Sequence, residues 1–410
     1  MPRFVPRVLV VLALAGVVAL LVRFVSAPPP DEVRATLSAA GAIAGGDTVG
    51  FARATEPRPF VFPDDHGPHP EYRTEWWYLT GNLADPSGRR FGWHITFFRN
   101  SLAPESVERA SAWSTNQLWM VHFALTDIGD GRHRAFERFA REAVGMAGAR
   151  VEPFRVWLDD WEIRSLGEAT GEGTGGPGGG HGDPAAIFPL QVRAGDEGWE
   201  VDLVLEAGKP IVLQGIDGWS QKGPEPGNAS YYFSFTRMPT RGRVSIAGES
   251  FEVEGTSWKD REWSTSALGE EHVGWDWFSL QLSDGRELMF FELRRDDGMS
   301  DPLNHGVVVE ADGTTRKLVA GEVELEVTGE WRSPLDGARH PSGWRARIPT
   351  EGFDLEIVPL VRDQEMNLSV RYWEGAVDVR GEGPDGPVEG VGFVELTGYG
   401  EVGGRAGGGG

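Results

Sequence analysis

The sequence predicts an all-β protein built of two antiparallel β-barrels in tandem. Three observations lead to this fold: segments in which apolar residues recur at every second position, turn signals between them, and a repetition of the pattern in the second half of the chain. The length of 410 residues fits two domains. The 16 tryptophans favour strands and aromatic-lined cavities.

Alternation with a period of two residues is clearest in residues 91–97, 119–125 and 201–205. It is typical of strands whose two faces have different surroundings. Turn signals such as Asp284-Gly285 and Asp312-Gly313 separate the predicted strands. We therefore expect antiparallel strands joined by hairpins.

The internal repeat divides the chain into two similar halves. Residues 76–83 open one hairpin, and residues 275–282 open a second hairpin of similar sequence. Each half closes with a Val-Glu-Gly segment, at 253–255 and 388–390, which an aromatic residue follows three positions later. Pairing of the opening and closing strands would seal each barrel and remove its edges. Chance similarity between aromatic β sequences is the alternative.

The repeat places one domain at residues 60–264 and the other at residues 265–402. Residues 28–59 are rich in Pro, Ala and Gly and predict a linker.

The N-terminal residues 1–27 have the pattern of a signal peptide or membrane anchor. Arg3 and Arg7 precede an apolar run over residues 8–22. Ala27 ends a small-residue cleavage motif, whereas Pro28 would hinder cleavage. A buried core helix is the alternative. We expect export, either into the periplasm or to an anchored position at the inner membrane that faces the periplasm or exterior.

The composition excludes several functions. The net charge of −23 argues against a nucleic-acid partner, because such a surface repels phosphates. The absence of cysteine excludes disulfides, cysteine-ligated metals and thiol catalysis. We expect no cofactor. His66, His69 and Glu71 have a spacing that could bind a metal, but no fourth ligand accompanies them, so no metal site is predicted.

Long tryptophan-rich motifs mark the chain. They are His66 to Tyr78, Trp119 to Asp127, Asn228 to Tyr232, Trp258 to Trp263, Gly274 to Trp277 and Tyr372 to Val377. These motifs resemble the carotenoid 1,2-hydratase family, also described as two-domain lipocalin-like proteins of the bacterial attachment-locus type. The resemblance covers nearly all of residues 60–400. It implies a lipocalin-like, calycin-type fold for each barrel and a hydrophobic ligand. Similar proteins include carotenoid hydratases, Diels–Alder-type cyclases and uncharacterised exported proteins.

The chain departs from the hydratase pattern at the functional motifs. In the hydratases the region resembles Asp-His-x-Trp followed by Tyr-x-Asp, whose aspartate is proposed to protonate the alkene. The first motif here is Asp260-Arg261-Glu262-Trp263, with arginine in place of histidine. The second, by approximate placement, is Phe290-Phe291-Glu292, with phenylalanine for tyrosine and glutamate for aspartate.

Three carboxylates are the candidate catalytic residues: Asp260, Glu262 and Glu292. Asp260 and Glu262 share a strand face and could divide acid and base roles, or they could belong to a ladder of ion pairs. Glu292 shares a face with Leu288 and Phe290. If that face lines an apolar cavity, burial would keep the carboxyl protonated for acid catalysis. An outward carboxylate or an ion pair with Arg294 is the alternative.

The candidate ligand-binding residues are mostly aromatic. They are Trp76, Trp77, Tyr78, His94, His122, Trp258, Trp263, Trp275, Asp276 and Trp277. Aromatic faces would stabilise a carbocation, and a histidine in a cavity could act as an acid or base. The two histidines are equally compatible with satisfied core positions.

The sequence leaves three functions open. The protein could be an enzyme that hydrates or cyclises an alkene of an isoprenoid or lipid-like molecule by acid catalysis. It could instead be a carrier for such a molecule, without chemistry. It could also be a periplasmic partner of a membrane export system.

Overall fold

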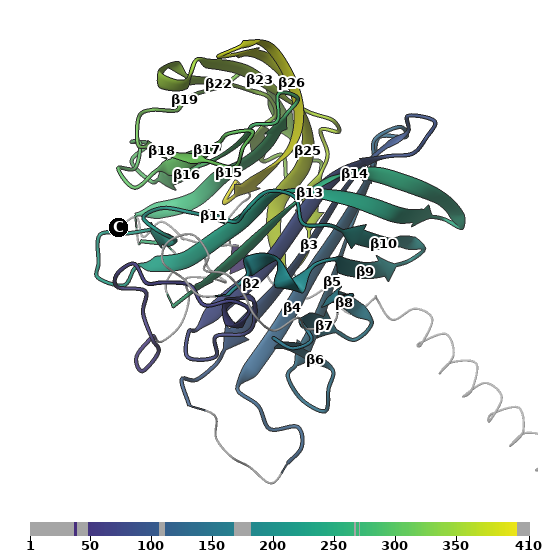
Figure 1. Cartoon of the computed structure of the whole chain (residues 1–410), viewed down its shortest axis with the longest axis vertical. Helices are drawn as coiled ribbons and strands as arrows, with labels where there is room; N and C mark the ends of the chain where they lie inside the picture. Colours follow the sequence, from purple (N-terminus) through teal and green to yellow (C-terminus); the bar gives the residue numbers. More distant parts are fainter. Residues whose placement is uncertain are drawn as a thin grey trace, which may run out of the picture. The chain divides into compact units, whose positions relative to one another are not determined.

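The computed structural model describes residues 37–38, 48–105, 111–167, 182–265, 268–269 and 271–399. The predicted signal or anchor segment at 1–27 lies outside these residues. The described chain is all-β apart from three short 3-10 turns, at Asp64–His66, Pro184–Ile187 and Pro349–Glu351. Two large sheets contain nearly all of the strands (Figure 1). The all-β prediction is confirmed.

The first sheet runs in the order β5-β4-β3-β2-β14-β13-β10-β9-β8-β7-β6. Its strands are β2 (Thr74–Ala84), β3 (Arg90–Ser101), β4 (Gln117–Asp127), β5 (Arg132–Arg141), β6 (Ala147–Arg150), β7 (Arg155–Leu158), β8 (Trp161–Ser165), β9 (Leu190–Asp196), β10 (Trp199–Leu205), β13 (Ala229–Ile246) and β14 (Glu249–Ser264). The short strands β11 (Val212–Leu213) and β12 (Trp219–Gln221) pair with β13. The three segments with clear alternation lie in β3, β4 and β10.

The second sheet runs in the order β18-β17-β16-β15-β26-β25-β23-β22-β19. Its strands are β15 (His272–Leu282), β16 (Glu287–Arg295), β17 (His305–Val309), β18 (Thr315–Val319), β19 (Glu324–Val327), β22 (Trp344–Ile348), β23 (Phe353–Pro359), β25 (Val370–Gly383) and β26 (Gly386–Thr397). β1 (Leu37–Ser38) and β24 (Glu365–Asn367) also pair with β25. β20 (Glu330–Arg332) and β21 (Arg339–Pro341) form a separate hairpin.

The opening and closing strands of each half pair as the repeat predicts. β2 pairs with β14 in the first sheet, and β15 pairs with β26 in the second. This pairing does not remove the sheet edges, contrary to the expectation. In the described part of the chain no pairing joins β5 to β6 or β18 to β19, so each barrel stays open along one seam. Charged side chains protect the edge strand β5, whose sequence is RHRAFERFAR.

Central strands of each sheet, such as β2, β3 and β16, bury both of their faces, whereas strands such as β10 and β23 leave one face partly exposed. The inner face of the first barrel holds a large aromatic core that includes Trp77, Trp93 and Trp263. The second barrel has its own core around Phe278 and Trp344. A third apolar cluster, with members from both sheets, joins their outer faces. The chain passes from the first sheet to the second between Ser264 and His272.

The segment before the first strand is partly ordered onto the first barrel. Phe51 and Ala54, which fall within the predicted linker 28–59, are buried in the first core or at its margin. The domain limits predicted at 60–264 and 265–402 stay predictions. Among the described residues, no helix has the length and apolar character needed to cross a membrane.

Candidate active site between the two sheets

A cavity of about 120 Å³ lies where the outer faces of the two sheets meet. This space is several times the roughly 10–15 Å³ that one water molecule needs. The first sheet contributes Trp76, Tyr78, His94, Thr96, Phe98, Met120, His122, Ser230, Tyr232, Asp260, Glu262 and Ser264. The second contributes Trp275, Trp277, Phe291, Leu293, Val370, Tyr372, Glu374 and Glu395, and Lys222 and Leu268 complete the lining. The cavity is thus outside both barrels.

The alternation of side chains in β14 explains how an acidic wall forms. Asp260 and Glu262 line the cavity, whereas Lys259, Arg261 and Trp263 lie on the opposite, inner face of the first barrel. Successive side chains of a strand point to opposite faces, so one strand supplies a cavity wall and a barrel core together. The same rule brings seven alternate residues of the neighbouring strands to the cavity: Trp76 and Tyr78 of β2, His94, Thr96 and Phe98 of β3, and Met120 and His122 of β4.

Asp260 is held by three hydrogen bonds. Its carboxylate accepts from Tyr232 Oη, Ser234 Oγ and Trp258 Nε1, each at 2.6 Å. Burial raises the pKa of Asp260 to about 6, although these three donors oppose the shift. Glu262, two residues further along the strand, accepts from Ser230 Oγ and lies 3.4 Å from Lys222 Nζ. One acid therefore has only neutral donors, and the other has a cation beside it.

Glu374 and Glu395 form a second pair of acids on the opposite wall. They are directly opposite each other in the register of β25 and β26, where side chains on one face are about 4.5–5.5 Å apart at Cβ. Glu374 is buried, and its Oε1 accepts from Tyr78 Oη at 2.7 Å. Its Oε2 has no hydrogen-bond partner among the described residues.

These two acids retain protons more strongly than ordinary glutamates. Burial, followed by the charge of Glu395, raises the pKa of Glu374 well above its usual range. Burial, followed by the charges of Asp260 and Glu262, raises the pKa of Glu395 to about 8. The pair therefore holds at least one proton at neutral pH.

Two neutral histidines lie on the first-sheet side of the cavity. His94 Nε2 is 2.6 Å from Thr96 Oγ1, and His94 Nδ1 has no partner among the described residues. His122 Nδ1 is 2.9 Å from Tyr372 Oη, which belongs to the second sheet. Burial is the main cause that lowers the pKa of both histidines. At neutral pH each imidazole is uncharged and able to accept a proton.

The protein-family comparison matches residues 53–399 to the model of the AttH-like family. A solved structure of an AttH protein from Nitrosomonas europaea is 32% identical, with 85% of this chain and 100% of that chain covered and a TM-score of 0.71. This chain belongs to the AttH-like family.

A second solved structure extends the fold comparison of this AttH-like chain. Kievitone hydratase from Nectria haematococca is 14% identical, with 86% of this chain and 99% of that chain covered and a TM-score of 0.61. At this identity the likeness shows the shared lipocalin-like fold. Among curated proteins, none matches this chain.

Most of the residues predicted for the site meet in the cavity between the two sheets of this AttH-like protein. Asp260, Glu262, Trp76, Tyr78, His94, His122, Trp275 and Trp277 all line it. Trp258 is buried behind Asp260, to which it donates a hydrogen bond, and it packs on Trp277 with ring centroids 6.2 Å apart. Trp77 and Trp263 are core residues of the first barrel instead.

Glu292 and Asp276 were expected at the site, and the structure places them elsewhere. Leu288 and Phe290, which share the face of Glu292, belong to the core of the second barrel, so this face does not line the cavity. Asp276 is opposite Glu292 in the register of β15 and β16. Its carboxylate accepts hydrogen bonds from Arg294 Nε at 2.9 Å and from Tyr399 Oη at 2.7 Å. Arg294 therefore pairs with Asp276 and not with Glu292.

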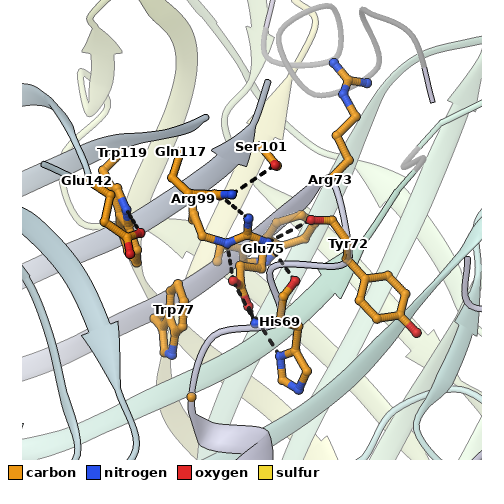
Figure 2. Close-up of polar contacts among 12 residues, drawn as sticks. His69, Tyr72, Arg73, Glu75, Trp77, Arg99, Ser101, Gln117, Trp119 and Glu142 are labelled. Atoms are coloured by element: carbon orange, nitrogen blue, oxygen red, sulfur yellow. Dashed lines mark hydrogen bonds and ion pairs between the residues drawn. The ribbon is translucent and has the colours of Figure 1, made fainter. Parts of the chain in front are cut away.

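Arg261, the residue that departs from the hydratase motif, lies outside the cavity. It contacts Glu75, which is fully buried. Glu75 also accepts from Arg99 and from the backbone N–H of His69 (Figure 2). Burial opposes ionisation of Glu75, yet Arg99 and Arg261 hold its pKa below the usual range. Arg73 points away from Glu75 in Figure 2. The arginine thus belongs to a structural network of the first barrel and does not contribute to the cavity wall.

His66 and His69, whose spacing could bind a metal, instead make hydrogen bonds within the first barrel. His66 Nε2 is 2.8 Å from the carbonyl of Pro184, and His69 Nε2 is 3.0 Å from Asp65. Elsewhere in the described chain, Glu271, His272 and Asp301 lie close together. His272 Nδ1 accepts from Gly269 N–H, and its Nε2 is 2.8 Å from Asp301, so both ring nitrogens are already engaged.

Glu374 and Glu395 were not among the residues that the sequence predicts for the site. The repeat contained the necessary signal for Glu395, because it aligns Trp258 with Phe393 and therefore Asp260 with Glu395. Glu374 lies two residues after Tyr372, on the same strand face. The motif Tyr372 to Val377, which contains Glu374, is visible in the sequence. The sequence does not show that this face of the strand borders the cavity.

Proposed function

We propose that this AttH-like chain binds an uncharged hydrophobic molecule, isoprenoid or lipid-like, and adds water to one of its carbon–carbon double bonds or cyclises it. The observation that carries the proposal is the Glu374–Glu395 pair, which retains a proton in a cavity walled by aromatic rings. Protonation of an unactivated alkene requires a neutral carboxylic acid in such surroundings.

In the first step Glu374 is the acid. The O–H bond at its Oε2 breaks, and the electron pair of the alkene forms a C–H bond at one carbon. The other carbon becomes a carbocation. The faces of Trp275, Trp277 and other lining aromatics stabilise this cation. Tyr78, which donates to Glu374 Oε1, stabilises the carboxylate that remains.

In the second step His94 is the base. A water molecule forms a C–O bond with the cation and releases a proton to the unpartnered Nδ1 of His94. The proton then returns to Glu374, so the net reaction is addition of water. In a cyclisation, a second double bond of the same molecule replaces water as the nucleophile. The new cation then loses a C–H proton to His94 and forms a double bond, and this proton returns to Glu374. The name of kievitone hydratase supports hydration as a reaction that this fold can carry.

The experiment is a labelling assay. The purified chain is incubated with isoprenoid alkenes and prenylated phenols in water labelled with oxygen-18, and products are analysed by mass spectrometry. We expect a product that carries the label, and a rearranged product of unchanged mass if cyclisation dominates. Glu374→Gln should abolish both products. Glu292→Gln is the matched control, because this carboxyl lies in the same sheet outside the cavity. Binding of the alkenes without any product would favour the carrier function instead.

Export is a further part of the proposal. The arginines at positions 3 and 7 and the apolar run at 8–22 support it. Residues 1–60 fused to a phosphatase that is active only outside the cytoplasm should give active enzyme. Retention of the fusion in washed inner membranes would support an uncleaved anchor, and a cytoplasmic, inactive fusion would contradict export.

A further inference from the structure

A second pocket, of about 190 Å³, lies between the sheets beyond Phe291. Its walls are largely apolar and include Ile216 and Trp219 from the first half of the chain and Leu303 and Leu318 from the second. Ile216 and Val319 are 55% and 62% exposed and mark its rim. The pocket therefore opens to solvent through apolar side chains, as an entry for a hydrophobic molecule would.

A single layer of side chains separates this pocket from the cavity. Phe291 lines the cavity, and its ring centroid is 4.4 Å from that of His305, which lines the second pocket. Lys222 Nζ lies 4.3 Å from the same ring on the cavity side, whereas its neighbour Gln221 lines the second pocket. The two spaces are thus adjacent along the chain and in space.

The two rings of this wall are held differently. His305 is fixed by polar contacts, with Nδ1 2.9 Å from the carbonyl of Leu303 and Nε2 3.3 Å from Ser220 Oγ. Phe291 has no polar side-chain atom and is held by packing and by the contact of its ring with Lys222 Nζ. A change of its rotamer breaks no hydrogen bond, so Phe291 is the movable part of the wall.

We propose that the cavity and the second pocket are two compartments of one elongated binding site, divided by Phe291. The cavity holds the reacting double bond, and the second pocket holds the distal end of the same uncharged isoprenoid chain. This inference rests on the proposed function, since it assigns the ligand of that cavity a length. Phe291 is then a residue that determines specificity for chain length.

The test measures the affinity of geraniol and of geranylgeraniol, which has twice as many isoprene units, by quenching of tryptophan fluorescence. Wild-type protein should bind geranylgeraniol at least about tenfold more tightly, because more apolar surface is buried. Ala320→Phe fills the second pocket and should remove this difference without changing the affinity for geraniol. Ala311→Phe, which puts the same ring on an exposed turn, should change neither affinity.

Ile216→Asp is a second variant, at an exposed position on the rim of the pocket. It should weaken geranylgeraniol selectively. If both alcohols bind and neither variant changes their ratio, the inference is overturned while the proposed function stands. If neither alcohol binds to wild-type protein, the proposed function and the inference both fail.

Discussion

Glu374 and Glu395 are opposite each other across the antiparallel pair β25–β26, on the side that lines the cavity. After burial, the charge of Glu395 raises the proton affinity of Glu374, and the charges of Asp260 and Glu262 raise that of Glu395. The stability of the fold should therefore depend on the protonation of this pair.

We predict that the contribution of Glu395 to the free energy of unfolding falls as pH rises from 4.5, its ordinary pKa, towards about 8, its raised pKa. At this residue the folded state keeps its proton over this range whereas the unfolded chain loses it, so the contribution decreases as pH rises. Glu395→Gln should reduce the loss by a few kcal/mol. Urea unfolding of both proteins across this pH range measures the effect. Equal slopes for the two proteins would show that Glu395 keeps an ordinary pKa.

His94→Gln should lower the rate of product formation by about 10²–10⁴-fold, the usual contribution of a general base. Affinity for the alkene should change little, because the substitution keeps a polar side chain of similar size. Comparison of binding titrations with turnover separates the two effects. A parallel loss of affinity and rate would assign His94 to ligand binding alone.

Glu292→Gln should leave ligand binding and turnover unchanged, because Glu292 lies on the inner face of the second barrel. Burial, followed by the charge of Asp276, raises the pKa of Glu292 to about 7. Above that pH the folded state holds an unfavourable carboxylate, which the amide removes. Thermal unfolding above this pH should therefore show an unchanged or higher Tm, whereas loss of turnover would return Glu292 to the catalytic site.

Arg261→Leu should destabilise the fold by about 3–5 kcal/mol, because it leaves the buried Glu75 with one of its two arginines. Arg243→Leu is the matched control, since Arg243 pairs with Glu252 at the surface, where removal costs about 0–1 kcal/mol. Denaturant unfolding of the two variants measures the difference. Equal, small losses would mean that Arg99 alone compensates the charge of Glu75.

The alternation in the sequence predicted which side chains share a strand face, and the structure agrees for Asp260 and Glu262. It did not predict which face borders the cavity, because β2 and the second half of β14 are buried on both faces and carry tryptophans on both. Trp77 and Trp263 were therefore assigned to the ligand although they belong to a core. Glu292 was assigned to the cavity for the same reason.

Contacts between the two halves of the chain could not be predicted from the sequence either. Tyr78 and Glu374 are 296 positions apart and meet only because the outer faces of two sheets pack together. No periodicity within either half carries this information. The motif around Tyr372 is visible in the sequence, but its contact with β2 of the other sheet is not.

The placement of opposite charges at successive positions of β14 makes the site sensitive to insertions. A shift of this strand by a single residue would bring Lys259 and Arg261 to the cavity and send Asp260 and Glu262 into the aromatic core, since side chains alternate strictly. The acidic wall would become basic at once. New ligand preferences can therefore evolve by substitution of residues in this wall. Insertions or deletions within the β13–β14 hairpin would instead destroy the wall.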